Sequence, residues 1–197
     1  MIISSTNRSN KSKEKRAINK DYYVTPIEPI IKFLNEFQHI ENYTFKDKLI
    51  LDPCAGGDIN NDMSYPKALK QIGATKVATL DIRQDSKAYI KTDYLTYDLP
   101  FKPNMIITNP PFNIAIDIIK KALNDIADGC WVIMLQRLNF FGTIERKPFW
   151  DEFMPQYAFV HNKRMSFIKG SSTDSIEYAH YVWKKNDYPE FCKLKVI

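Results

Sequence analysis

The stretch Asn104-Met105-Ile106-Ile107-Thr108-Asn109-Pro110-Pro111-Phe112 has the pattern of a short buried strand that ends in a rigid turn. Paired prolines end the strand and leave a polar side chain, carbonyls and a ring at the edge of a sheet, where open α/β sheets bind ligands. An exocyclic amino group has two N–H donors, which the Asn109 side-chain oxygen and the Pro110 carbonyl can accept together. Phe112 offers a stacking face. The stretch predicts a site for a flat amine, and the alternative is a plain turn.

Apolar runs of strand length alternate with helical patterns along the rest of the chain. We expect strands at residues 48–52, 76–81, 87–91, 104–108 and 130–135, and an antiparallel hairpin formed by 157–168 and 175–183 around a turn at 169–172. Helical spacing is present at 27–37, 64–72, 113–128 and 143–154, and Thr25-Pro26-Ile27-Glu28 has the form of a capping box. The order predicts an α/β fold with a doubly wound, mostly parallel seven-stranded sheet and a C-terminal antiparallel hairpin.

The positive charge is concentrated at the N-terminus. The 197 residues carry a formal charge of +5, and residues 1–20 account for all of it. We expect these residues to form a flexible basic tail, either a phosphate-attracting arm or a solvated terminus. Residues 21–197 are predicted to form a single domain without a separate target-recognition domain.

Cysteine usage and hydropathy exclude several classes of protein. Three widely spaced cysteines indicate neither a disulfide framework nor a zinc site, so no metal is expected. No apolar run reaches membrane-spanning length, and we expect a cytoplasmic monomer without membrane contact.

Acidic residues and a glycine turn follow the predicted strands in order. Asp52 and Gly56 come after the first strand, Asp81 after the second and Asp93 after the third. In a doubly wound sheet these strand ends line one crevice, where glycine lets the backbone approach a ligand and an acidic residue can hold ribose hydroxyls. The turn at 52–57 lacks both the dinucleotide and the phosphate-loop signatures. The pattern predicts a nucleoside pocket.

The same residues resemble a known family. Asp21-Tyr22-Tyr23-Val24-Thr25-Pro26, Asp52-Pro53-Cys54-Ala55-Gly56, Asp81, Asp93 and Asn109-Pro110-Pro111-Phe112 are similar, in content and order, to the motifs of S-adenosylmethionine-dependent adenine-N6 DNA methyltransferases. Weaker similarity at 137–140, 164–167 and 174–179 extends to the small methylases of phages and mobile elements. The resemblance implies a class I methyltransferase fold of the Rossmann-like type.

The resemblance also implies roles for particular residues. Thr25 and Pro26 would lie near the methionyl carboxylate, Asp81 at the ribose and Asp93 at the cofactor's adenine. The implied cofactor-binding set is Tyr23, Thr25, Pro26, Asp52, Pro53, Ala55, Gly56, Asp81, Ile82, Asp93 and Tyr94, and the implied catalytic set is Asn109, Pro110, Pro111 and Phe112. Alternatives remain, because Thr25 could be only a helix cap, Asp85 competes with Asp81 and Asp98 competes with Asp93.

Two departures from the family pattern stand out. Asp58 occupies the place of the family's second glycine, which leaves the shape of the cofactor loop open. Without a recognition domain, target binding is expected from residues 137–170, whose aromatic side chains could equally be packed core. The basic residues there are Arg137, Arg146, Lys147, Lys163, Arg164 and Lys169.

The resemblance implies a function. The protein is expected to transfer methyl groups from S-adenosylmethionine to adenine N6 in DNA, releasing S-adenosylhomocysteine, in a bacterial or phage-infected cell. An RNA adenine or a protein glutamine amide is an alternative acceptor, because each presents the same planar amino group. A catalytically inactive binding module is the alternative from another class.

Overall fold

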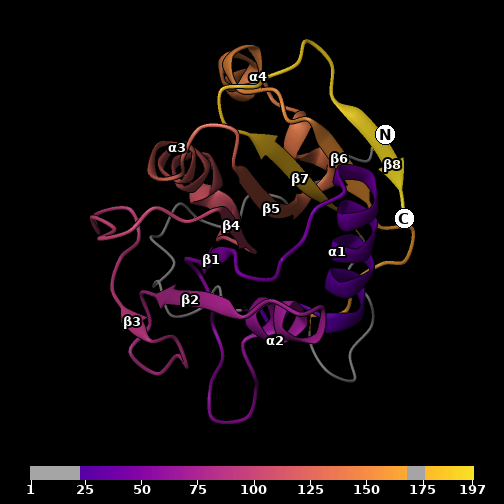
Figure 1. The fold of residues 1–197 in the computed structure, drawn as a ribbon. Helices are drawn as coiled ribbons and strands as arrows, with labels where there is room; N and C mark the ends of the chain where they lie inside the picture. The colour runs from indigo at the N-terminus through magenta and orange to yellow at the C-terminus, as the bar shows by residue number, and fades with distance from the viewer. Residues whose placement is uncertain (1–22, 168–175) are drawn as a thin grey trace, which may run out of the picture.

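The computed structural model describes residues 23–167 and 176–197. In this part of the chain the strands form one eight-stranded sheet in the order β3-β2-β1-β4-β5-β7-β6-β8 (Figure 1). The strands are β1 (Leu49–Asp52), β2 (Lys76–Asp81), β3 (Ile90–Lys91), β4 (Met105–Thr108), β5 (Trp131–Arg137), β6 (Tyr157–Val160), β7 (Tyr178–Lys184) and β8 (Lys193–Val196).

The first five strands are parallel. β1 pairs with β2 on one side and β4 on the other, β2 also pairs with β3, and β4 also pairs with β5. Asn104 joins β4 to β1, because its side-chain oxygen accepts a hydrogen bond from the Leu49 N–H at 2.9 Å and its own N–H donates to the Leu49 carbonyl at 2.7 Å. The carboxyl ends of β1, β2 and β4 therefore meet at one edge of the sheet.

Helices cover both faces of the sheet. The helices are α1 (Ile27–Glu41), α2 (Ser64–Gln71), α3 (Ala115–Asp125) and α4 (Lys147–Glu152), with 3-10 turns η2 (Phe112–Ile114), η3 (Leu138–Phe141) and η4 (Ile144–Arg146). α1 and α2 pack on one face and α3 and α4 on the other (Figure 1). Alternate residues of β5 enter the two cores, with Ile133 facing the first and Val132 the second. This explains why the parallel strands are apolar at almost every position.

The C-terminal strands run against the others. β7 lies between β5 and β6 and is antiparallel to both, while β8 extends the sheet parallel to β6. A buried polar chain connects this region to α2. Tyr65 Oη lies 2.9 Å from His180 Nε2, and His180 Nδ1 lies 2.8 Å from His161 Nε2. Burial lowers the pKa of both imidazoles, that of His161 to about 4, so both are neutral at physiological pH.

The predicted fold class is confirmed, and several element predictions need correction. The sheet has eight strands among the described residues rather than seven, because β8 was not predicted. The strand expected at 87–91 is only Ile90–Lys91, and the helix expected at 143–154 is the 3-10 turn η4 followed by α4. The hairpin pairing of β6 and β7 is present, with both strands shorter than expected, and its predicted turn and the tail at 1–20 lie outside the described residues.

Candidate functional site

The site begins where β1 leaves the sheet between β2 and β4. This position is the topological switch point of the parallel part, since the chain adds strands on one side of β1 up to β3 and then on the other side. Ligands of open α/β sheets bind in the crevice at the carboxyl ends of such strands. The turn at 53–57, the loop after β2 and the proline turn after β4 all start at this edge.

The turn after β1 is buried and has a backbone conformation that suits glycine. Gly56 and Gly57 have φ angles of 65° and 75°, in the left-handed region. A Cβ added to Gly57 would lie 2.9 Å from Met63 Cγ and 3.0 Å from Lys87 Cβ. The turn is held to its neighbours, because the Ala55 N–H donates to the Leu80 carbonyl at 2.9 Å and the Lys87 N–H donates to the Gly56 carbonyl at 3.1 Å.

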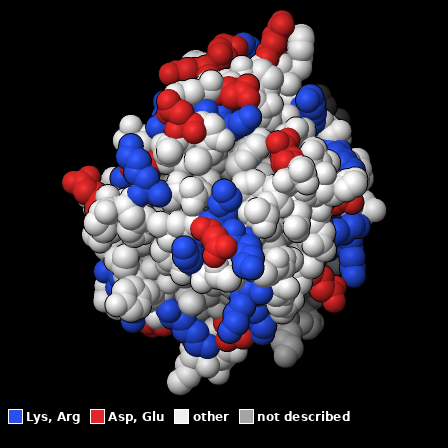
Figure 2. Space-filling model, in the orientation of Figure 1, with Lys and Arg blue, Asp and Glu red and all other residues white. Residues whose placement is uncertain are grey.

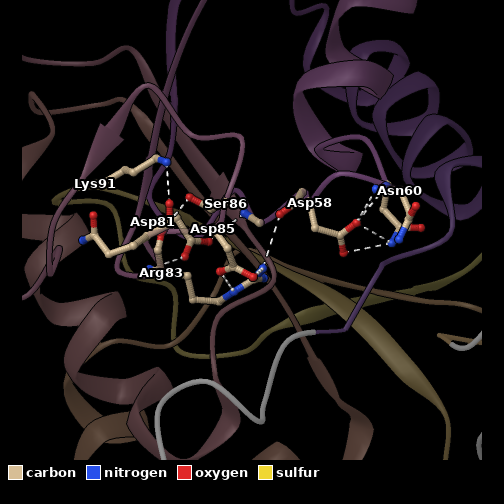
Figure 3. A network of polar contacts seen from close by, with 11 residues as sticks. Asp58, Asn60, Asp81, Arg83, Asp85, Ser86 and Lys91 are labelled. Atoms are coloured by element: carbon tan, nitrogen blue, oxygen red, sulfur yellow. Dashed lines mark hydrogen bonds and ion pairs between the residues drawn. The ribbon is translucent and has the colours of Figure 1, made fainter.

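Asp81 fastens this turn from the end of β2. Its Oδ2 accepts a hydrogen bond from the Gly56 N–H at 2.7 Å, and its Oδ1 accepts one from the Arg83 N–H at 2.8 Å. Figure 3 shows Asp81, Arg83, Asp85 and Ser86 gathered at this turn. Each carboxylate oxygen retains a second acceptor position, so Asp81 can hold a ligand hydroxyl while it positions the glycine turn.

Arg83 braces the same loop and explains the position of Asp85. Its guanidinium is buried, donates to the Gly57 carbonyl at 3.4 Å and pairs with Asp85 at 3.1 Å. Asp85 itself is exposed, and the Arg83 hydrogen bond lowers its pKa. The rival ribose ligand named from the sequence is therefore the ion-pair partner of the loop's arginine. Arg83 carries no signal in the sequence, since a buried guanidinium is recognised only from its environment.

Asp52 is a buried carboxyl at the carboxyl end of β1. Its Oδ1 accepts a hydrogen bond from the Cys54 N–H at 3.2 Å, and in the described part of the chain no group donates to its buried Oδ2. Loss of hydration raises the pKa of Asp52 to about 7; the Thr108 hydroxyl nearby opposes the rise but makes no hydrogen bond of ordinary geometry. A cationic ligand group would relieve this cost.

Asp58 turns away from the crevice into its own loop. Its Oδ1 accepts hydrogen bonds from the N–H groups of Asn60 and Asn61 at 2.7 and 2.9 Å, and the Asn61 side chain donates to both carboxylate oxygens (Figure 3). The Asn61 hydrogen bonds are the main reason that the pKa of Asp58 is lowered. The residue that departs from the family pattern thus closes a separate turn and leaves the two glycines free to shape the crevice.

The amide of Asn109 is oriented by Thr25. Asn109 Nδ2 donates to Thr25 Oγ1 at 3.0 Å, so Oδ1 is the atom left for a ligand. Oδ1 is buried and accepts no hydrogen bond from the described residues. The predicted capping box is wrong, because α1 begins at Ile27 with Pro26 as its N-cap residue and no side-chain cap. The Thr25 hydroxyl serves the proline turn instead.

Phe112, three residues after Asn109 in the sequence, lies in a small aromatic pocket. The pocket has a volume of about 60 Å³ and is lined by Tyr23, Phe112, Arg137, Phe167 and Tyr178. The Arg137 guanidinium lies over the Phe112 ring, with Cζ 4.8 Å from the ring centre. The rings of Phe112 and Tyr178 are 6.0 Å apart and those of Phe167 and Tyr178 are 4.9 Å apart. Phe167 and Tyr178 lie in the stretches 164–167 and 174–179, which resemble the small methylases, but neither residue had a predicted role.

The fold is shared with solved methyltransferase structures. The chain matches a proposed class I S-adenosylmethionine-dependent methyltransferase from Listeria monocytogenes with a TM-score of 0.63, at 14% identity over 88% of this chain and 65% of that one. It matches a proposed RNA methyltransferase from Pyrococcus horikoshii with a TM-score of 0.62, at 16% identity over 84% of this chain and 88% of that one. The chain has the class I methyltransferase fold.

A third structure with this fold is the M protein of the type I restriction enzyme EcoKI. The TM-score is 0.62, at 12% identity over 85% of this chain and 45% of the M protein. The chain thus spans less than half of the M protein and about two thirds of the Listeria protein. Neither a family model nor a curated protein sequence matches it.

The remaining predicted cofactor residues occupy varied places in the methyltransferase fold. Asp93 is half-buried and its Oδ1 accepts a hydrogen bond from the Leu95 N–H at 3.0 Å, whereas its rival Asp98 is exposed. Tyr94 is buried in the core with Lys121 of α3 over its ring. Ile82 is exposed after β2, Tyr23 lines the aromatic pocket, and Pro53 and Pro110 are buried at their turns. Pro111 precedes η2 as its N-cap residue.

The predicted nucleic-acid residues that the structure describes differ in their partners. Lys147 pairs with Asp151, Arg164 pairs with Glu177 at 3.1 Å, and Arg146 donates to the Phe140 carbonyl at 3.1 Å. Lys163 is exposed, and Lys169 lies outside the described residues. Among the five of these residues that the structure describes, Arg137 is the one that lines the aromatic pocket. On the face drawn in Figure 2, acidic side chains gather near α4 and basic ones near α2, so neither sign covers the whole face.

Neither a metal-binding cluster nor a membrane-spanning helix is found in residues 23–167 and 176–197. No group of three or more histidine, cysteine, aspartate or glutamate side chains is arranged there to hold a metal ion. In the same residues, no helix has both the length and the hydropathy needed to span a membrane.

Proposed function

We propose that the protein transfers a methyl group from S-adenosylmethionine to the exocyclic N6 amine of adenine in DNA. The observation that carries the proposal is the buried Asn109 Oδ1, whose amide is oriented by Thr25 and which has no donor among the described residues. Such an acceptor, next to the Phe112 ring, suits a planar aromatic amine.

The crevice fits S-adenosylmethionine. The buried Asp52 Oδ2 has no donor in the described part of the chain and can accept one from the ammonium of the methionyl group. Gly56 and Gly57 give the turn after β1 its left-handed course, and Asp81 has acceptor positions for the ribose hydroxyls. When bound, the cofactor supplies an electrophilic methyl group on its sulfonium.

The residues after β4 activate the amine. The N6 lone pair is delocalised into the adenine ring, so the free amine is a poor nucleophile. Asn109 Oδ1 and the Pro110 carbonyl would accept one N–H each and hold the nitrogen closer to tetrahedral geometry, which frees the lone pair for in-line attack. Thr25 keeps the Asn109 amide in the orientation that this requires. After transfer the nitrogen is acidic and loses its proton to water, so no strong general base is needed.

Stacking on Phe112 would offset part of the cost of bringing the base to the site. Extrusion of a base from duplex DNA costs a few kcal/mol, and stacking on an aromatic side chain contributes about 1 to 3 kcal/mol. Correct orientation of the two reactants supplies up to about 7 to 11 kcal/mol more.

The test is transfer of labelled methyl groups to DNA. We expect wild-type protein to label adenine-containing DNA and Asn109→Ala to lose labelling, while both bind S-adenosylmethionine equally in calorimetry. Asn124→Ala is the matched control, because Asn124 is exposed near the C-terminal end of α3, away from the proline turn. Labelling that persists in Asn109→Ala would contradict the proposed site.

RNA adenine is the second candidate acceptor. It is favoured by the similarity to the Pyrococcus protein, which this chain matches over most of both lengths. Digestion of the labelled product with a deoxyribonuclease, a ribonuclease or a protease separates DNA, RNA and a glutamine amide as acceptors. An inactive binding module would be indicated if calorimetry showed no binding of S-adenosylmethionine.

A further inference from the structure

Arg137 occupies the place where a base would stack. It is the last residue of β5, and its guanidinium carbon lies 4.8 Å from the centre of the Phe112 ring. Its Nε also donates to Tyr178 Oη at 3.4 Å, so the guanidinium is held by two aromatic side chains. A planar cation on an aromatic face takes the position that an aromatic base would take.

Arg137 covers the face of Phe112 on which a base would stack. Its guanidinium borders the pocket and lies over the ring, so a base can stack on that face only after the guanidinium has moved. Tyr178 is buried and its ring contacts both Phe112 and Phe167, so this wall is packed against the core. Arg137 is half-buried at the end of β5, so its long side chain can leave the Phe112 ring without disturbing the core.

We propose that Arg137 gates the base pocket and makes the site selective for polynucleotides over free nucleosides. This inference rests on the proposed function. An entering adenine must displace the guanidinium from Phe112 and Tyr178. A phosphate of the same strand can then take up the released cation through charge-assisted hydrogen bonds. A free nucleoside carries no phosphate and must open the gate without that compensation.

The gate predicts effects of opposite sign in one variant. In Arg137→Ala, the affinity for 2′-deoxyadenosine should rise about fivefold, because a cation–ring contact no longer has to be broken. The affinity for single-stranded oligodeoxyadenylate should fall about fivefold or more, because the phosphate contact is lost. Both ligands are titrated with saturating S-adenosylhomocysteine, which keeps the nucleoside out of the cofactor crevice. A merely structural role of Arg137 would weaken both.

Lys184→Ala is the matched control. Lys184 lies over the Trp131 ring, with Nζ 5.4 Å from its centre, and pairs with Trp131 at the opposite end of β5. The Lys184→Ala substitution removes a cation–ring contact far from the pocket and should leave the affinities for 2′-deoxyadenosine and for oligodeoxyadenylate unchanged.

A spectroscopic measurement observes the gate directly. Stacking on Phe112 should shift the Arg137 Nε–H resonance upfield through the ring current, and Arg137→Lys identifies the signal by removing it. We expect the shift to disappear when oligodeoxyadenylate is added. A signal that stays in place at saturation, or equal loss of both affinities in Arg137→Ala, overturns the gate. Neither measurement needs methyl transfer, so the gate can hold where no DNA is labelled, and can fail where DNA labelling succeeds.

Discussion

Replacement of Asp52 with asparagine should stabilise the ligand-free protein while weakening cofactor binding. Asparagine has the same shape and keeps an oxygen to accept the Cys54 N–H, but carries no charge. The new amide group would meet the Thr108 hydroxyl, a buried oxygen with no hydrogen bond of its own among the described residues. The substitution therefore removes the buried charge and little else.

The size of the gain follows from the pKa. Burial raises the pKa of Asp52 from 3.8 to about 7. Each unit corresponds to about 1.36 kcal/mol, so ionising Asp52 in the folded protein costs at most about 4 kcal/mol. Between these two pKa values the folded state binds a proton that the unfolded chain has lost, and the free energy of unfolding falls as the pH rises. The gain should be near zero at pH 4 and about 2 to 4 kcal/mol at pH 8.5.

Urea unfolding followed by tryptophan fluorescence measures this difference at both pH values. Asp128→Asn is the control, since Asp128 is 76% exposed and its pairing with Lys185 at 3.8 Å is a surface ion pair worth about 1 kcal/mol or less. An Asp52→Asn protein no more stable than wild type at pH 8.5, or equally stabilised at both pH values, would show that charge burial is not the cause.

Cofactor binding should respond in the opposite direction. A hydrogen bond to a charged group contributes about 1.5 to 3 kcal/mol, so Asp52→Asn should weaken S-adenosylmethionine binding about ten- to a hundredfold at pH 8. Because the bound cation favours ionised Asp52, wild-type affinity should rise as the pH increases toward 7 and beyond, with proton release on binding at pH 6. Calorimetry in buffers of different ionisation enthalpy measures that proton, and its absence would count against contact with Asp52.

Two further substitutions test the remaining parts of the site. Thr25→Val removes the acceptor for Asn109 Nδ2 and should raise the activation free energy of methyl transfer, measured from kcat, by about 1 to 3 kcal/mol. Thr25→Ser keeps the hydroxyl and should keep the wild-type kcat. Equal losses of kcat in both variants would contradict the orienting hydrogen bond. Gly57→Ala should lower the free energy of unfolding, measured in urea, more than Gly129→Ala does. Both positions have a positive φ, which alone costs alanine about 1 to 2 kcal/mol, but of the two only Gly57 lacks space for a Cβ. Equal losses in the two variants would refute the close packing at Gly57.

Apolar runs and glycine positions in the sequence were enough to predict individual strands and turns. The apolar run before Asn109 is the buried strand β4, and the glycines after Asp52 adopt the conformation that their type allows. β8 was missed because four exposed residues alternate too briefly to be distinguished from a tail, and its partner β6 is over thirty residues away.

Tertiary contacts decided what local patterns could not. The sequence Thr25-Pro26-Ile27-Glu28 has all the features of a capping box, but Asn109, 84 positions further along the chain, takes the threonine hydroxyl. The contact of Arg137 with Phe112 likewise joins two strand ends through the parallel pairing of β4 and β5. Such contacts follow from sheet order, which periodicity does not specify.

The most direct test of the proposed function is to identify the methylated atom. DNA incubated with the protein and S-adenosylmethionine is digested to nucleosides and analysed by mass spectrometry against synthetic standards. We expect N6-methyl-2′-deoxyadenosine from the wild-type protein and none from Asn109→Ala. A methyl group found only on cytosine, on another adenine atom or on no nucleoside of DNA would contradict adenine-N6 methylation of DNA.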